Sequence, residues 1–174
     1  MKKLFTLTLL LSYFLHASQA STPTQQPLFN ITDTKGNTYQ IQGTDNGLKV
    51  KGMENKVLFL EFFGHRCPPC LATIPHLIEL QKKYPEKLAI ISIEVQGYNN
   101  AQLQKFVAKK GMNYIVVADE KSDNLVNYIS QRAQWKGSIP FMLALDTKGN
   151  VQFIQAGLIP QASLDALVQK LLKK

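Results

Sequence analysis

The chain has 174 residues, enough for one domain with a substantial hydrophobic core. Hydrophobic residues make up 45% and charged residues 18%, which excludes an intrinsically disordered chain. The formal net charge is +8, but the lysines are spread along the sequence and never form a run of five or six. A nucleic-acid-binding protein is therefore not indicated.

The first twenty residues have the pattern of a secretory signal. Residues 1–3 are a basic start, residues 4–15 are apolar apart from Thr and Ser, and Ser18 and Ala20 are the small residues that a signal peptidase reads. The apolar stretch is short for a bilayer span, which favours cleavage after Ala20; an uncleaved membrane anchor is the alternative. The sequence thus predicts a signal peptide over 1–20, a flexible leader over 21–27, a folded domain over 28–174 and a periplasmic location.

The elements expected in the folded domain alternate between strands and helices. Residues 57–63 and 88–95 are almost continuously apolar, as strands buried on both faces are. In chain order we expect a hairpin of strands at 29–33 and 38–42, a strand at 57–63, a helix at 68–84 kinked at Pro75, a strand at 88–95, a helix at 101–110, a strand at 114–118, a helix at 123–131, antiparallel strands at 141–145 and 151–156, and a helix at 163–172. This order predicts a mixed central β-sheet with helices on both faces.

The only two cysteines, Cys67 and Cys70, lie in the segment GHRCPPC between an expected strand and an expected helix. A disulfide that closes so short a loop adds only about 2 kcal/mol in the chain-entropy model, so a purely structural bridge is a weak alternative. A metal site is a second alternative, but two thiolates supply half of a closed zinc site, and His65 and His76 would not easily converge on them. The third interpretation is redox chemistry, because a helix N-terminus stabilises an attacking thiolate at Cys67.

The residues around the pair would tune this thiol. Pro68 and Pro69 stiffen the ring but remove two amide donors. Arg66 adds a positive charge directly before Cys67 and could offset that loss. The alternative for Arg66 is an ordinary exposed cation.

The chain resembles the thioredoxin superfamily, and within it the exported thiol–disulfide oxidoreductases related to TlpA and ResA. VLFLEFFGHRCPPC at 57–70 is similar to the family's strand leading into a CxxC helix, and Gly137-Ser138-Ile139-Pro140 is similar to its cis-proline loop. Residues from about 99 to 118 resemble the extra helix and strand of the TlpA-like branch. The resemblance spans roughly 28–173 and implies an α/β thioredoxin fold: a central mixed β-sheet flanked by helices, with an N-terminal β-hairpin and a TlpA-type αβ insertion.

The resemblance also implies roles for the site residues. Cys67 would attack the partner's disulfide, Cys70 would resolve the mixed disulfide, and the two would form the redox-active disulfide. Pro140 would be cis, whereas without the resemblance a trans proline at a strand entry would be favoured. Ile139 would offer its backbone to the bound partner segment as an extra strand.

Glu61 interrupts the apolar strand six positions before Cys67, where thioredoxin itself has a buried Asp. Burial of a carboxylate is costly and raises its pKa toward the working range. We expect Glu61 to accept the proton of Cys70 when the resolving thiol ionises. The alternative is a side chain that reaches solvent at the edge of the sheet.

These features predict an exported enzyme that exchanges electrons with protein dithiols and disulfides, with no cofactor and no metal. The resemblance implies reduction of cysteine-containing exported proteins, as in cytochrome c maturation or repair of oxidised cysteines. It also implies a membrane-bound thiol reductase as electron donor and a monomeric state. A periplasmic thiol oxidase and a non-catalytic copper-binding module are the alternatives. A peroxidase is disfavoured, because the usual Thr and Pro neighbours are missing upstream of the cysteine.

The chain also departs from the family pattern. Arg66 stands where these families usually carry Trp, and Gly64-His65 replaces the more usual pair of small residues. Thr73 stands where many ResA-like members have a Glu. The segment directly before Cys67 is therefore where we expect the partner preference to differ.

Overall fold

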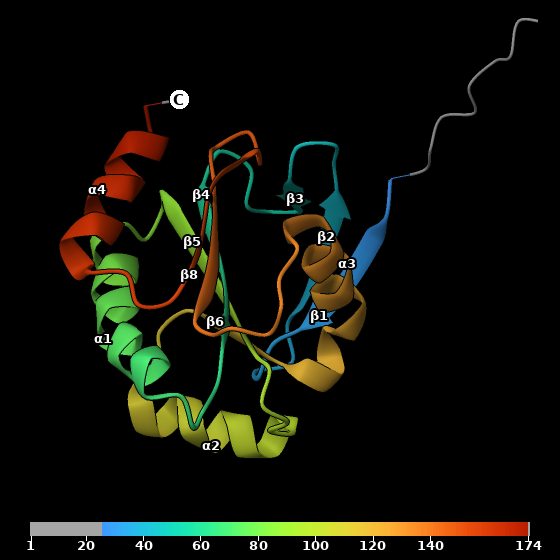
Figure 1. Cartoon of the computed structure of the whole chain (residues 1–174), viewed down its shortest axis with the longest axis vertical. Coiled ribbons are helices and arrows are strands. Elements are labelled where there is room, and N and C mark those ends of the chain that lie inside the picture. Colours follow the sequence, from blue (N-terminus) through green and yellow to red (C-terminus); the bar gives the residue numbers. More distant parts are fainter. Residues whose placement is uncertain (1–25, 174) are drawn as a thin grey trace, which may run out of the picture.

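A five-stranded mixed sheet forms the centre of the computed structural model, which describes residues 26–173 (Figure 1). The signal predicted over 1–20 and most of the leader lie outside the described residues. The strand order is β6-β5-β4-β7-β8. The strands are β4 (Val57–Phe63), β5 (Leu88–Glu94), β6 (Ile115–Ala118), β7 (Phe141–Leu145) and β8 (Val151–Ala156). The first three run parallel, and β7 is antiparallel to both β4 and β8.

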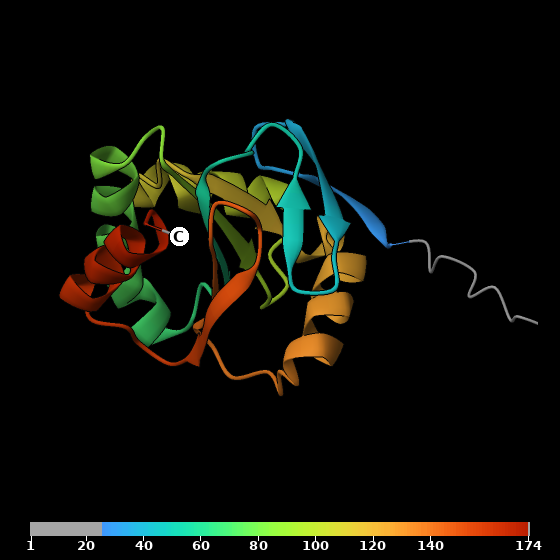
Figure 2. The same ribbon diagram turned by 90° about the horizontal axis from the view of Figure 1, so that it is seen from above.

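Helices and a second, small sheet cover the two faces of the central sheet. The helices are α1 (Pro68–Lys83), α2 (Asn100–Lys110), α3 (Asp123–Ala133) and α4 (Gln161–Leu171), and the 3-10 turn η1 (Asp119–Lys121) precedes α3. The antiparallel small sheet consists of β1 (Leu28–Thr32), β2 (Thr38–Gly43) and β3 (Leu48–Val50). Figures 1 and 2 show α1 and α4 on one side of the central sheet, and α3 with the small sheet on the other. None of the helices formed by residues 26–173 is long and apolar enough to cross a bilayer.

The hydrophobic core is divided by the sheet into two clusters. Phe59 and Phe63 of β4 pack with the buried residues of α1, α2 and α4, whereas Leu60 and Phe62 pack with α3 and the small sheet. Successive strand side chains point to opposite faces, so a strand with an apolar layer on each side is apolar throughout. All seven residues of β4 are buried for this reason.

The predicted mixed sheet with helices on both faces is confirmed, with differences at the ends of elements. Strand β3 was not predicted; its three residues add a third strand to the predicted hairpin. Helix α2 begins one residue earlier than predicted, because Asn99 and Gln102 form a reciprocal capping box at its N-terminus. Helix α1 runs through Pro75, where a kink was predicted.

Candidate active site

Cys67 and Cys70 lie where β4 leads into α1 (Figure 1) and are joined by a disulfide with a Cα–Cα distance of 5.2 Å. Cys67 is the N-cap of α1, and its Sγ accepts a hydrogen bond from the Cys70 amide at 3.2 Å. Cys67 is 6% exposed and Cys70 is fully buried, so only the first sulfur can meet a partner. This is the arrangement expected for an attacking and a resolving cysteine.

The amides at the start of α1 provide unusually little support for a charge on Cys67. An N-cap side chain normally accepts hydrogen bonds from the second or third helical residue. Pro68 and Pro69 take the first two helical positions and carry no amide hydrogen. In the described part of the chain, the Cys70 amide is the one hydrogen-bond donor to the Cys67 sulfur.

The loop before β7 faces the disulfide from the other side. The Ile139–Pro140 peptide bond is cis, the isomer that the resemblance implies. The Ile139 carbonyl oxygen lies 3.7 Å from Cys67 Sγ. This carbonyl can accept a hydrogen bond from a Cys67 thiol but offers nothing to a thiolate.

Trp135, which the sequence analysis did not single out, anchors this loop. Its Nε1 donates to the Ser138 carbonyl at 2.7 Å, and its ring packs against Phe62 and Phe141. The sequence signal for this anchor was the position of the single Trp of the chain, a few residues before the Ile-Pro pair.

The segment before Cys67 is fixed to the end of β5 through its backbone. The amide and Nδ1 of His65 lie 3.4 and 2.8 Å from Glu94 Oε1, and the Arg66 amide donates to Gln96 Oε1 at 2.8 Å. A Cβ at Gly64 would clash with the Gln96 side chain, so a larger residue there would displace the group that accepts from the Arg66 amide. The segment 64–66, which replaces the family's aromatic residue, is therefore held by the last residue of β5, Glu94, and by Gln96, which follows it.

The side chains of His65 and Arg66 differ in their surroundings. The His65 ring stacks on Tyr98, with ring centroids 3.5 Å apart and planes 7° apart. Arg66 is exposed and forms no ion pair with residues 26–173. The Arg66 guanidinium thus faces solvent beside Cys67, while its backbone is fixed.

Glu61 is buried in the central strand β4, with 1% of its surface exposed, and does not reach solvent at a sheet edge. Its side chain lies on the same face of β4 as Phe59 and Phe63, which pack in the cluster that contains both cysteines. Burial raises the pKa of Glu61 to about 7, and a hydrogen bond from Ser92 opposes this rise. A carboxylate with such a pKa can take up and release a proton near neutral pH.

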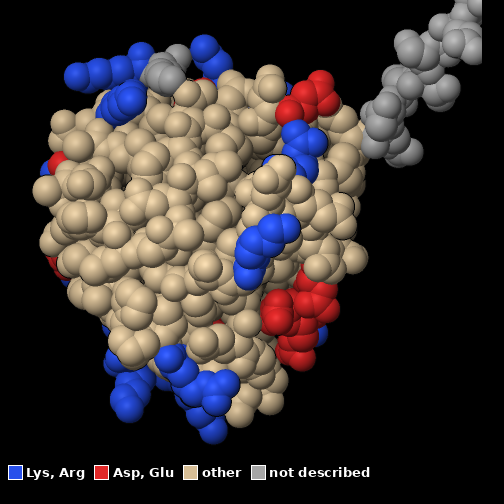
Figure 3. All heavy atoms as spheres, in the orientation of Figure 1, with Lys and Arg blue, Asp and Glu red and all other residues tan. Residues whose placement is uncertain are grey.

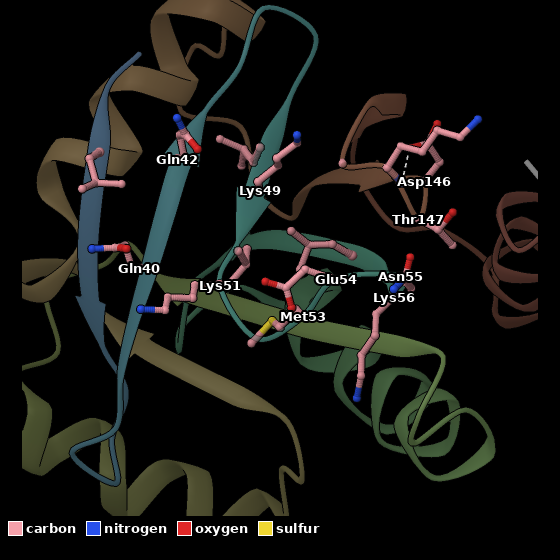
Figure 4. Close-up of a pocket in the computed structure, with 16 residues that line it drawn as sticks. Gln40, Gln42, Lys49, Lys51, Met53, Glu54, Asn55, Lys56, Asp146 and Thr147 are labelled. Atoms are coloured by element: carbon pink, nitrogen blue, oxygen red, sulfur yellow. Dashed lines mark hydrogen bonds between the residues drawn. The ribbon is translucent and has the colours of Figure 1, made fainter. Parts of the chain in front are cut away.

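A separate cleft of about 570 Å³ lies between β2, β3 and the turn that joins β7 to β8 (Figure 4). Lys49, Lys51, Lys56 and Lys148 line it together with Glu54 and Asp146. Neither cysteine nor Ile139 lines this cleft, so it takes no part in the chemistry of the disulfide.

Comparison with known proteins agrees with this geometry. The family model described as "AhpC/TSA family" matches residues 24–154. The chain is 24% identical over 159 residues to the thiol-disulfide oxidoreductase ResA of Geobacillus kaustophilus, covering 91% of this chain and 82% of that protein.

Solved structures share the fold. A thiol:disulfide interchange protein of Chlorobium tepidum matches with a TM-score of 0.66 at 22% identity, over 87% of this chain and 98% of that one. A secreted disulfide oxidoreductase of Mycobacterium tuberculosis, homologous to E. coli DsbE, matches with a TM-score of 0.62 at 21% identity, over 82% and 96%. The predicted thioredoxin fold is confirmed.

Proposed function

This chain belongs to the AhpC/TSA family of the thioredoxin superfamily and is a ResA-like thiol–disulfide oxidoreductase, and we propose that it acts as an exported reductant of protein disulfides. The observation that carries the proposal is the geometry of Cys67, a partly exposed helix N-cap bonded to buried Cys70 and facing the Ile139 carbonyl. Its substrates are cysteine pairs of other exported proteins.

The reaction proceeds in two exchanges. The Cys67 thiolate attacks one sulfur of the partner's disulfide; a Cys67–partner bond forms, the partner's disulfide breaks, and the leaving sulfur takes up a proton. Glu61 then accepts the proton of Cys70, whose thiolate attacks the Cys67 sulfur and displaces the partner's second thiolate, which is protonated in turn. The partner has gained two electrons and two protons, and Cys67–Cys70 is oxidised. A membrane-bound thiol reductase returns the electrons.

The surroundings of the Cys67 sulfur support the proposed direction of electron flow. Donors to a thiolate stabilise the reduced form and make the couple more oxidising. Here one amide donates, two positions are proline, and the nearby Ile139 carbonyl is an acceptor. A poorly stabilised thiolate favours a low reduction potential, and therefore a reductant rather than a thiol oxidase.

The reduction potential of the Cys67–Cys70 couple tests this proposal directly. We expect a value nearer to the about −270 mV of thioredoxin than to the about −120 mV of the oxidase DsbA. Equilibration with dithiol and glutathione buffers gives the potential, and insulin reduction gives the activity, with Cys67→Ser as the inactive control. A potential close to that of DsbA would favour the oxidase, and tight Cu(I) binding without insulin reduction would favour the copper-binding module.

Two matched proline variants test the cause of the low potential. Pro69→Ala restores the amide of the second helical residue, which can reach the Cys67 sulfur, whereas Pro68→Ala restores an amide of the first, which does not cap. A hydrogen bond to a charged group contributes about 1.5–3 kcal/mol, so Pro69→Ala should raise the potential by about 30–60 mV. Pro68→Ala should change it little. Equal shifts in both variants would contradict the argument from amide donors.

A further inference from the structure

Three polar side chains from neighbouring strands form a buried cluster in the same core layer as the cysteines. Glu61 of β4 is 1% exposed, Ser92 of β5 is 0% exposed, and Tyr114, directly before β6, is 6% exposed. Glu61 and Ser92 are register partners in the parallel pair β4–β5. Ser92 and Tyr114 lie on the face of the sheet that α1 covers, because their neighbours Ile90 and Val116 pack in that cluster.

The two carboxylate oxygens of Glu61 differ in their surroundings. Ser92 Oγ donates to Oε2 at 2.7 Å. Oε1 is buried and has no hydrogen-bond partner among the described residues, and the same holds for the Tyr114 hydroxyl. Buried polar atoms are nearly always paired, so two unpaired atoms in one cluster require an explanation, and a free carboxylate oxygen is a possible proton acceptor.

The electrostatics place Tyr114 in the same cluster. After burial, the charge of Glu61 is the next cause that raises the pKa of the Tyr114 hydroxyl, and Ser92 opposes this rise. The register partners of Glu61 are Ser92 of β5 and the apolar Met142 of β7. Glu94 lies on the same face of β5 two residues beyond Ser92, and Tyr114 and Cys70 belong to the core cluster on this side of the sheet. No cation contributes to the shift in the pKa of Glu61.

We propose that Ser92 and Tyr114 are positioning residues that prepare Glu61 as the proton acceptor, with Oε1 as the atom that receives the proton of Cys70. The inference rests on the proposed function, in which Cys70 must ionise before it attacks. Because the Ser92 hydroxyl donates to Oε2, Oε1 is the carboxylate oxygen that stays free to accept a proton. The Cys70 S–H bond breaks, an O–H bond forms at Oε1, and the electron pair stays on sulfur for its attack on Cys67. The Tyr114 hydroxyl, which has no partner among the described residues, is the second polar group that can respond to the charge of the ionised carboxylate.

The experiment follows Glu61 itself as well as the reaction. In the reduced protein, carbon-13 labelling of glutamate carboxyls allows the Glu61 pKa to be read by NMR, the signal being assigned by its loss in Glu61→Gln. Single-turnover kinetics of a preformed mixed disulfide give the pH profile of resolution. The test variants are Ser92→Ala and Tyr114→Phe. Ser130→Ala and Tyr128→Phe in α3, on the opposite face of the sheet, are the matched controls.

Ser92→Ala removes a donor to the ionised carboxylate, so both the Glu61 pKa and the midpoint of the pH profile should rise, by about one unit. Below the midpoint, resolution then slows about tenfold at a given pH. Tyr114→Phe should raise the Glu61 pKa and the midpoint of the pH profile by a smaller amount. Ser92→Thr keeps the hydroxyl and should show the wild-type values of both, which provides a test if Ser92→Ala folds poorly.

Three outcomes are distinguishable. A joint rise in pKa and midpoint supports the inference. If neither moves in Ser92→Ala, the inference is overturned, while loss of the pH-dependent phase in Glu61→Gln would still uphold the proposed role of Glu61. If the Glu61 pKa rises and the profile stays, Glu61 is not the acceptor in this step and the inference fails with that role.

Discussion

Glu61 combines a cost in stability with the proposed role as proton acceptor. Its pKa is raised from 4.5 to about 7 by burial, so between these values the folded protein holds a proton that the unfolded chain has lost. Stability therefore falls as the pH rises through this window. The contribution is fully present below about pH 4.5 and is lost above about pH 7.

This linkage predicts the behaviour of Glu61→Gln. The oxidised wild-type protein should lose about 3 kcal/mol of unfolding free energy between about pH 4.5 and about pH 8 through this group, and the variant should lack that loss. Urea denaturation of the oxidised proteins at both pH values measures it. Glu79→Gln, at an exposed position of α1, is the control and should follow the wild type. Parallel pH dependence of Glu61→Gln and wild type would show that Glu61 is not protonated on folding.

At the scale of elements, the lead-in to α1 is stabilised by β5 rather than by an aromatic residue beside the cysteine. Glu94 is fully buried and accepts from the amides of His65, Gln96 and Tyr98 as well as from the His65 ring. Buried carboxylates are tolerated where hydrogen bonds compensate their loss of solvation. The ends of β4 and β5 are thereby joined into one rigid platform for Cys67.

His65→Phe should weaken this platform. The variant keeps a ring that can stack on Tyr98 but loses the donor to Glu94, which should cost about 1.5–3 kcal/mol of unfolding free energy. Amide hydrogen exchange of residues 65–67 should accelerate, whereas exchange in α3 should stay unchanged. Tyr98→Phe preserves both the stack and the backbone donor and serves as the control. Wild-type stability and exchange in His65→Phe would show that the ring contact with Glu94 contributes nothing.

The same elements show how far the sequence predicts the structure. The long apolar runs of β4 and β5 were predicted within one residue, because burial on both faces leaves a clear pattern. β3 was missed, because three residues carry no measurable periodicity and become a strand only by pairing with β2.

For the site, the CxxC spacing and the Ile-Pro pair pointed to residues that the fold brings together. The contacts of His65 with Glu94 and of Trp135 with Ser138 were not predictable, since they depend on where separate loops meet. Local patterns predict elements, whereas side chains that join the ends of different strands require the folded chain.

At the scale of the whole molecule, the positive charge is dispersed. Figure 3 shows lysines and arginines in separate groups along the top, the bottom and the right half of one face, acidic residues at its upper and lower right, and a broad area without charged residues at its centre and left. No continuous basic patch appears on the face in view.

The redox state of the site is linked to the stability of the entire domain. A reductant has a disulfide that the folded state favours, so the oxidised protein should be the more stable form, by about 2 kcal/mol for a loop of this size. An oxidase such as DsbA shows the opposite order, because its reduced form is stabilised. Urea denaturation with and without dithiothreitol tests this, with Cys67→Ser as a variant that should not respond. A more stable reduced form would reverse the proposed direction of electron flow.

The backbone of Arg66 is fixed, whereas its side chain belongs to the surface that a partner would meet. Its amide is bonded to Gln96, whereas its side chain is exposed and unpaired within residues 26–173. Substitutions at this position can therefore change the surface that a partner meets while the cysteines keep their geometry. Position 66 is thus a site where natural or designed variation can alter the choice of partner without moving the cysteines, while a change of its charge also acts on the Cys67 thiolate.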